Sequence, residues 1–333
     1  MLEKPDLPDD AIIACLRSDY GLEIDRIAFL PLGADVESAV YRAESSDGGG
    51  SYFVKLRRGV FDDITVAVPR LLHEQGIAPI IAPLAAQSGR LWAALGAFTL
   101  MLYPFVEGRN GFEADLSPRQ WVKFGQALRA IHTVSVPPAL AARLEQERYS
   151  DHWRQMVADF QAQVERDSFD DPIAAEMAAF VREKRKEISR LVRQAHRLAE
   201  VLKSRPQTFA LCHADIHMGN LLIDERGDRF FIVDWDNPIL AVKERDLMFI
   251  GAGIVRQTTP EEAALFYQGY GDTEIDPVAL AYYRCERIVQ DIAAYCEQLL
   301  PTAGNSPDRV EGLRQFTSQF LPGSVIEIAY RTE

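Results

Sequence analysis

Residues 211–220 read LCHADIHMGN, and residues 230–236 read FFIVDWD. In the first stretch, Asp215 follows a short apolar run that predicts a strand, and Asn220 comes five residues later. Between the two stretches, apolar runs flank a polar turn, which is typical of a β-hairpin. Such a hairpin would bring Asn220 and Asp234 to the same end, where both could reach one ion.

This combination of side chains is typical of enzymes that move the γ-phosphoryl group of a nucleotide onto an alcohol. On a loop positioned by a strand, the Asp215 carboxylate could orient an attacking hydroxyl or accept its proton. The Asn220 amide and the Asp234 carboxylate offer the oxygen ligands that Mg²⁺ binds together with phosphates. We therefore predict Asp215 as the catalytic residue, and Asn220 and Asp234 as Mg²⁺ ligands.

The first hundred residues are rich in predicted strands. Residues 39–43 and 52–56 alternate in hydrophobicity on either side of the glycines at 48–50, which predicts a hairpin. Lys55 lies on the second of these strands. An edge-strand lysine could simply reach water along its stem. In a phosphoryl-transfer enzyme we expect it to grip the α- and β-phosphates, held by a nearby acid for which Asp63 is the best candidate.

Two other segments are candidates for nucleotide contacts. The loop at 33–38 could cover the phosphates through backbone N–H groups, with Gly33 as its glycine, and an ordinary loop explains it equally well. At a predicted hinge, the backbone of Tyr103, Pro104 and Val106 could meet the edge of an adenine. Pro104 has no N–H, so only its carbonyl could take part.

The pattern becomes helical after residue 116. Residues 117–120 read SPRQ, which is typical of a capped helix start, and an apolar face follows at Trp121, Phe124, Leu128 and Ile131. Helical patterns return over much of the remaining chain. We therefore predict an α+β fold with two lobes. A β-rich N-lobe at 1–103 is joined by a hinge at 104–110 to a mainly helical C-lobe at 111–333.

A rival interpretation concerns His213, Asp215 and His217, which alternate as H-x-D-x-H and could face one transition metal. That site would leave the amide, the second carboxylate and the lysine unexplained, and no further cluster of His or Cys in the sequence completes it. We expect instead that His213 packs in the core with its ring bonded to backbone.

The charge of the chain indicates which kinds of molecule the protein binds. Asp and Glu total 49 of the 333 residues against 36 Lys and Arg, which gives a formal net charge of −13. An acidic surface repels nucleic acids and anionic membranes and attracts small cations. We therefore expect a cationic small molecule as partner, no nucleic acid and no membrane, and the sequence implies no protein partner.

The sequence also favours a compartment. The N-terminal MLEKPD lacks the basic start and apolar run of a signal peptide, and no apolar stretch is long enough to span a membrane. The four cysteines show no CxxC spacing, which fits free thiols in a reducing compartment. We therefore expect the protein in the cytoplasm.

The motifs HADIHMGN at 213–220 and IVDWD at 232–236 resemble the catalytic and metal motifs of the aminoglycoside phosphotransferases. Shorter stretches resemble the spectinomycin phosphotransferase branch of that family, and the likeness runs from about Tyr20 to Glu327. These stretches are FVKL around Lys55, YPF at 103–105, NGF at 110–112, KERDLMFI at 243–250 and ERIV at 286–289.

The resemblance implies a protein-kinase-like fold and the ATP- and Mg²⁺-dependent phosphorylation of a hydroxyl on spectinomycin, an aminocyclitol with two methylamino groups, which confers resistance. Asp215 matches the family's catalytic aspartate, Asn220 and Asp234 its metal ligands, and Lys55 its phosphate-gripping lysine. Residues 103–106 match its adenine-binding hinge.

The chain departs from the family pattern in the N-lobe helix. Asp63 stands where a Glu is usual, and Pro69 interrupts the predicted helix. Both departures concern the partner of Lys55 rather than the catalytic or metal residues. In the C-lobe, we expect Asp246, beside Arg245, to brace the lobe rather than touch substrate.

A dicationic acceptor needs carboxylates around its amines. We expect Asp236, Glu286 and Asp291 to supply them, with Glu244 as a further candidate. Asp291 lies four residues after Arg287 on a predicted helix, so these two could instead pair on a solvated face.

Two other functions remain open. One is a small-metabolite kinase of the same fold, acting on choline, homoserine or methylthioribose, because motifs for nucleotide chemistry do not choose the acceptor. The other is a nucleotide-binding regulator without transfer activity. Degenerate catalytic residues would be typical of such a regulator, and here the set is intact.

Overall fold

The structure, a computed structural model, describes residues 3–33, 35, 37–45, 48–224, 228–250 and 258–330. The chain divides into two compact units, which are described separately below. Unit 1 comprises Met1–Leu144 and Met218–Pro238, and unit 2 comprises Glu145–His217 and Ile239–Glu333. The lobe boundaries expected from the sequence stay a prediction.

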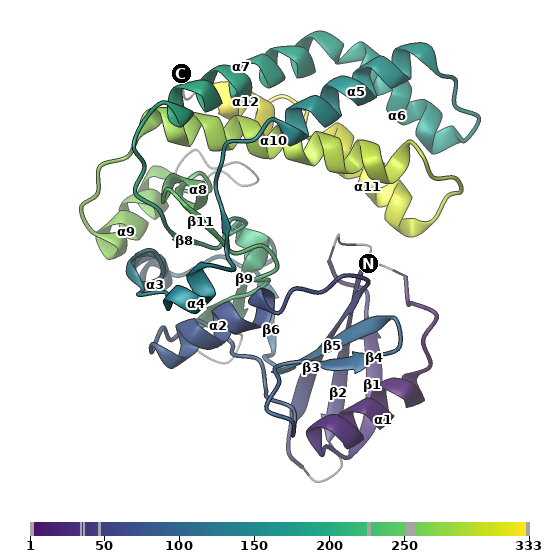
Figure 1. The fold of residues 1–333 in the computed structure, drawn as a ribbon, viewed down its shortest axis with the longest axis vertical. Coiled ribbons are helices and arrows are strands. Elements are labelled where there is room, and N and C mark those ends of the chain that lie inside the picture. Colours follow the sequence, from purple (N-terminus) through teal and green to yellow (C-terminus); the bar gives the residue numbers. More distant parts are fainter. Residues whose placement is uncertain are drawn as a thin grey trace. The chain divides into compact units, whose positions relative to one another are not determined.

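Unit 1 begins with helix α1 and contains a five-stranded sheet in which all neighbours are antiparallel (Figure 1). Its strand order is β1-β2-β3-β5-β4. One face packs on α1, because alternate apolar residues such as Tyr41, Val54 and Leu100 are fully buried against Ile12 and Leu16 of that helix. The bounds are α1 Asp9–Tyr20, β1 Ile24–Leu30, β2 Ser38–Ser45, β3 Ser51–Arg58, β4 Ala93–Leu95 and β5 Phe98–Pro104.

The predicted hairpin around the glycines at 48–50 is confirmed, with β2 and β3 as its strands. In the register of the sheet, Lys55 lies opposite Val40 of β2 and Met101 of β5. Strand β3 therefore has a neighbour on both sides, and the edge-strand interpretation of Lys55 is wrong.

The rest of unit 1 contains further helices and a second, three-stranded sheet of order β10-β9-β6. Strands β9 and β10 form the predicted antiparallel hairpin, whose turn at 225–227 lies outside the described residues. Pro69 is accommodated inside α2, which continues to Glu74. The bounds are α2 Ile64–Glu74, β6 Gly108–Asn110, α3 Pro118–Thr133, α4 Pro138–Ala141, the 3₁₀ turn η1 Met218–Asn220, β9 Leu221–Asp224 and β10 Phe230–Ile232.

Helix α3 begins as the sequence predicts. The Ser117 hydroxyl accepts the Gln120 N–H at 3.3 Å, and the Gln120 side chain accepts the Ser117 N–H at 2.8 Å. The apolar face of the helix is buried, and the Phe124 ring packs edge-on against Phe230 of β10, with 6.0 Å between the ring centroids. The helix thus supports the hairpin that ends just before Asp234.

Unit 2 is built on the long helix α10, which contacts α5, α7, α11 and the short α8 (Figure 1). Its core includes the fully or almost fully buried Met177, Leu191, Ile288, Ile292 and Phe316. The helix bounds are α5 His152–Arg166, α6 Pro172–Glu183, α7 Arg185–Lys203, α8 Glu244–Leu247, α9 Pro260–Tyr270, α10 Pro277–Leu299, α11 Pro307–Ser318 and α12 Val325–Tyr330.

A small sheet in unit 2 supports the loop that contains Asp215. Its order is β7-β11-β8, with β11 parallel to β7 and antiparallel to β8. The bounds are β7 Glu145–Gln146, β8 Ala210–Cys212 and β11 Ile239–Ala241. The predicted strand before Asp215 is therefore confirmed as β8.

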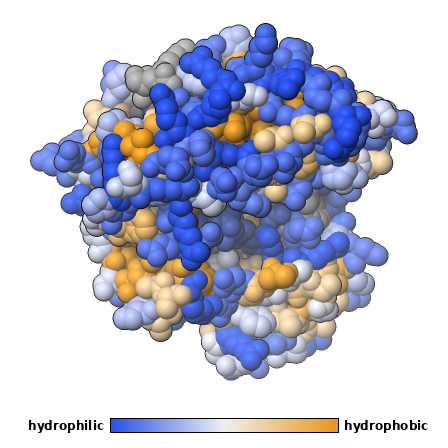
Figure 2. Space-filling model, turned by 45° about the horizontal axis from the view of Figure 1, so that its top comes forward, coloured by the Kyte–Doolittle hydropathy of each residue, from blue (hydrophilic) through white to orange (hydrophobic). Residues whose placement is uncertain are grey.

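Figure 2 shows one face of the molecule coloured by hydropathy. The face of the molecule in Figure 2 carries mostly hydrophilic residues, with apolar residues in small groups between them. Within the described part of the chain, no helix combines the length and the apolar content that crossing a membrane would require.

The capping box of α3 gives a stability prediction. Ser117→Ala removes the oxygen that accepts the Gln120 N–H, so we expect the free energy of unfolding to fall by about 1 kcal/mol. Urea denaturation measures this loss. Ser88→Ala is the matched control, because the Ser88 hydroxyl is exposed and accepts a long 3.4 Å contact from the Arg90 N–H. Equal midpoints for Ser117→Ala and the wild type would contradict the capping role.

Candidate active site

The loop after β8 is held by a buried carboxylate of unit 2. Asp246 of α8 is fully buried and accepts the backbone N–H groups of His213 at 2.9 Å and Ala214 at 2.7 Å. Ala214 has a φ of 71°, in the left-handed region that non-glycine residues rarely adopt. The two hydrogen bonds therefore stabilise an unusual turn directly before Asp215, and Asp246 braces the predicted catalytic loop.

His213 is almost fully buried, and its Nδ1 accepts the backbone N–H of Asp215 at 3.3 Å. The imidazole thus takes part in shaping the loop, which is the core role expected from the sequence. Since Nδ1 is engaged with backbone, this geometry gives no support to a transition metal bound by H-x-D-x-H.

Asp215 is contacted by an arginine from α10. Arg287 Nη1 donates to Asp215 Oδ1, and His217 Nε2 lies 3.7 Å from the same oxygen. Burial raises the pKa of Asp215, but the positive charge of Arg287 and smaller effects of His217 and His213 outweigh it. The pKa of Asp215 therefore lies below its ordinary value, and the residue is a carboxylate at neutral pH.

Arg287 also contacts Asp291, with 2.9 Å between Nε and Oδ1. The structure contains the Arg287–Asp291 pair that the four-residue spacing allowed as an alternative, but the Arg287 side chain is only 17% exposed, so it does not lie on a solvated face, and it also contacts Asp215. Sequence reasoning missed this contact. In the sequence, only the four-residue spacing of Arg287 and Asp291 indicated that Arg287 is paired. The contact with Asp215 joins residues 72 positions apart, so no local pattern predicts it.

In unit 1, Lys55 lies between two carboxylates that follow β10. Its Nζ is 2.8 Å from Asp234 Oδ1 and 2.6 Å from Asp236 Oδ1, and its side chain is 14% exposed. Burial lowers the pKa of Lys55, and the two negative charges raise it to a net value above the ordinary one. Burial raises the pKa of Asp236, which the Lys55 charge only partly offsets.

The acid that holds Lys55 differs from the one expected. Asp63 precedes α2 with an exposed side chain and contacts Arg143, while the partners of Lys55 are Asp234 and Asp236. The expectation that Asp63 pairs with Lys55 is not met. The reason is that the carboxylates after β10 reach the ammonium, whereas Asp63 is engaged with Arg143.

The β9–β10 hairpin places the backbone segments that contain the predicted metal ligands, Asn220 and Asp234, side by side. Val233 N–H donates to the carbonyl of Asn220 at 3.0 Å, so Asn220 is hydrogen-bonded to the residue before Asp234. Asp234 and Asp236 both direct an oxygen at the Lys55 ammonium. Oxygens from an amide and two carboxylates are the donors that Mg²⁺ prefers, so this set suits that ion.

The remaining nucleotide candidates have less distinctive surroundings. Gly33 has a φ of 84° and open space where a Cβ would lie, while Ala34 and Val36 of the same loop lie outside the described residues. Tyr103 and Pro104 end β5, paired with Phe53 and Tyr52 of β3, and Val106 follows with a half-buried side chain. Their contacts with a nucleotide stay predictions.

Of the predicted substrate residues, Glu286 differs from the others in burial. It is 5% exposed, and its Oε2 lies 2.6 Å from Arg154 Nη1. Burial raises its pKa to about 7, against the opposing effect of Arg154. The Asp236 and Asp291 side chains are 26% and 25% exposed, so they are more accessible to a ligand.

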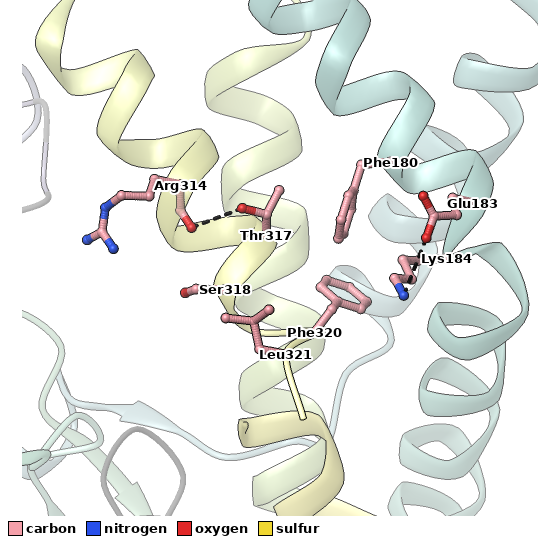
Figure 3. A pocket seen from close by; sticks show the side chains of 8 residues that line it. All are labelled: Phe180, Glu183, Lys184, Arg314, Thr317, Ser318, Phe320 and Leu321. Atoms are coloured by element: carbon pink, nitrogen blue, oxygen red, sulfur yellow. Dashed lines mark hydrogen bonds and ion pairs between the residues drawn. The ribbon is translucent and has the colours of Figure 1, made fainter. Parts of the chain in front are cut away.

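A separate pocket of about 360 Å³ lies in unit 2 (Figure 3). Phe180, Glu183 and Lys184 line it from α6 and the residue that follows, and the α11 region supplies the other lining side chains, among them Leu321. It contains none of the residues that the sequence marks for catalysis or binding.

Comparison with known proteins decides the family. A family model described as "Phosphotransferase enzyme family" matches residues 28–283. The chain belongs to this family. Its predicted phosphotransferase activity is therefore confirmed, and so is the α+β, protein-kinase-like fold.

Two solved structures are similar over nearly the whole chain. A crystal structure of spectinomycin phosphotransferase APH(9)-Ia in complex with ADP and spectinomycin is 39% identical, with a TM-score of 0.90, over 98% of this chain and 99% of the other. An AMP-bound complex of APH(9)-Ia is 38% identical, with a TM-score of 0.86, over 97% and 98%. Protein StrN of Streptomyces griseus is 26% identical over 67% of this chain and 69% of its own length.

The buried Glu286 gives a pH prediction for this family member. Because its pKa rises from 4.5 to about 7 on folding, its stabilising effect is complete below pH 4.5 and is lost as the pH rises to about 7. Glu286→Gln has no carboxyl group to ionise at this position. Across this range, the free energy of unfolding of the wild type should therefore fall relative to that of Glu286→Gln, by up to about 1.4 kcal/mol per pH unit.

Urea denaturation at several pH values measures this difference. The exposed Glu183 gives the matched control, since Glu183→Gln changes the same chemical group outside the core. A constant difference between wild type and Glu286→Gln from pH 4.5 to 7 would show that Glu286 does not titrate in this range.

Proposed function

We propose that the protein transfers the γ-phosphoryl group of ATP to a hydroxyl of spectinomycin or a close aminocyclitol, with Mg²⁺, and thereby confers resistance. The observation that carries this proposal is the similarity to APH(9)-Ia, which extends over 98% of the chain at 39% identity. That enzyme was crystallised with ADP and spectinomycin. Fold alone would not choose the acceptor, but identity at this level over the full length supports a shared one.

In the proposed reaction, Asp215 orients the acceptor hydroxyl and accepts its proton. Its low pKa makes it a weak base. A weak base is sufficient, since the transition state of phosphoryl transfer is largely dissociative and depends mainly on positioning. The brace from Asp246 on the preceding residues supports that positioning.

The nucleotide would be bound by residues of unit 1. Lys55 would exchange its carboxylate contacts for phosphate oxygens, while Asn220 and Asp234 hold Mg²⁺. When bound, this ion neutralises charge on the phosphoryl oxygens. The backbone of Gly33 would face the phosphates, and residues 103–106 would face the adenine. Asp63 has no part in this proposal, because it contacts Arg143.

A cationic acceptor fits the charge of the chain. The net charge of −13 favours a small cation, and Asp291 and Asp236 are carboxylates with accessible side chains. Glu286 is less suited to direct contact, because it is buried against Arg154. We infer that Asp291 is a better candidate than Glu286 for contact with an amine of the acceptor. We also infer that the enzyme works in the cytoplasm, where ATP is available.

The direct test is incubation with MgATP and spectinomycin. The product should be heavier by one phosphoryl group, and one ADP should form for each molecule modified. Asp215→Asn keeps the size of the side chain but not its charge, so kcat should fall by at least about 100-fold. Mass spectrometry and coupled ADP detection follow both quantities. An unmodified antibiotic in the wild-type reaction would refute the proposal.

The metal role of Asp234 is tested by magnesium dependence. Asp234→Ala removes a carboxylate ligand, so half-maximal ADP formation should need more than about tenfold more Mg²⁺. Asp228→Ala is the matched control, since Asp228 lies just before β10 and contacts Lys123 and Ser117 instead. If both variants keep the wild-type dependence, Asp234 is not a metal ligand.

A further inference from the structure

Arg287 is the basic residue that joins the predicted catalytic loop to helix α10. One nitrogen of its guanidinium donates to Asp215 and another lies 2.9 Å from Asp291, one turn further along the helix. The three side chains all belong to unit 2. Nothing in the phosphoryl-transfer chemistry itself requires an arginine at this place.

This arginine is held in one orientation. A guanidinium is a planar fork, so contacts through Nε and Nη1 with two different carboxylates fix its plane. Its Cζ lies 6.0 Å from the centroid of the Phe249 ring, and that ring packs edge-on against His217. Three neighbours from separate segments therefore restrict its movement.

The low exposure of the Arg287 side chain favours pairing of its charge with a carboxylate. The Arg287 side chain is 17% exposed, and removing a charge from water is unfavourable unless the charge is paired. Asp291 alone would pair it, as a simple helix-surface bridge does. The second contact, with Asp215, fixes the carboxylate that the reaction uses.

We propose that Arg287 is a positioning residue that holds the Asp215 carboxylate in the orientation needed to receive the acceptor hydroxyl. The catalytic meaning of this inference rests on the proposed function of Asp215. Arg287 itself does not react. It acts through Asp215, and Asp291 keeps it in place.

The charged groups around Asp215 set the expected effect of removing the arginine. Among the described residues of unit 2, the charged or titratable groups that act on Asp215 or on its partner Arg287 include Asp291 on α10, and His213 and His217 on the loop. Arg287 gives the largest effect that lowers the pKa of Asp215. Without it, burial and the negative charge of Asp291 would both raise that pKa.

The test compares Arg287→Met and Arg287→Lys with the wild type and with Arg197→Gln, which removes the same charge from an exposed site on α7. In Arg287→Met, kcat should fall on the order of 100-fold because the carboxylate loses its fixed orientation. The KM for ATP should not change. The acid limb of the pH profile of kcat should move to higher pH. Arg287→Lys keeps the positive charge but not the planar fork, so it should return this limb to its wild-type pH more fully than it returns kcat to its wild-type value.

A second readout does not need activity. Carboxyl ¹³C NMR follows the titration of Asp215, whose signal is identified by its loss in Asp215→Asn. We expect its midpoint to rise by about one pH unit or more in Arg287→Met and to stay unchanged in Arg197→Gln. Thermal unfolding of each variant shows whether it is folded at the temperature of the assay.

These readouts separate the two proposals. A wild type that phosphorylates no aminocyclitol refutes the proposed function, while the NMR titration still decides whether Arg287 controls Asp215. An active wild type with unchanged kcat, pH profile and Asp215 midpoint in Arg287→Met refutes the positioning role. A loss of kcat with both pH readouts unchanged would also contradict it, because a general structural defect would then explain the loss.

Discussion

The carboxylate of Asp246 accepts two backbone N–H groups from the loop that follows β8. Because Asp246 is fully buried, losing these bonds would leave a charge without solvation, which is among the costliest defects in a protein. The loop is therefore tied to α8, and the left-handed conformation of Ala214 is retained. Asp215 comes next in the chain, so its position follows from this one set of hydrogen bonds.

Paired charges also organise the candidate site residues within each unit. In unit 2, Arg287 joins Asp215 to Asp291. In unit 1, Lys55 joins Asp234 and Asp236. In both units a cation from a regular element, α10 or β3, holds carboxylates of which at least one has a predicted role in the reaction. A ligand that bears the matching charge can exchange with these contacts without leaving a buried charge unpaired.

The sequence predicted the features that depend on local patterns. The capping box of α3, the β2–β3 and β9–β10 hairpins and the strand before Asp215 all follow from turn residues or from periodicity over a few positions. The relation of Asn220 to the residue before Asp234 follows from the hairpin in the same way.

The partners of charged residues could not be predicted in this way. Lys55 and Asp234 are 179 positions apart, and Asp215 and Arg287 are 72 positions apart. Periodicity shows which face of an element is buried, but not which distant side chain meets it. For Lys55, proximity in sequence favoured Asp63, whereas the structure pairs Asp63 with Arg143. Asp291 was expected near the substrate, and only the structure links it to Asp215 through Arg287.

The central claim is that the phosphoryl acceptor is an aminocyclitol. The most direct measurement is a set of kcat/KM values, read by ADP release, for spectinomycin, choline, homoserine and methylthioribose under one MgATP concentration. Our account predicts that spectinomycin exceeds each metabolite by at least about 100-fold, a difference in transition-state free energy of about 2.7 kcal/mol. A metabolite with a kcat/KM above that of spectinomycin would contradict it.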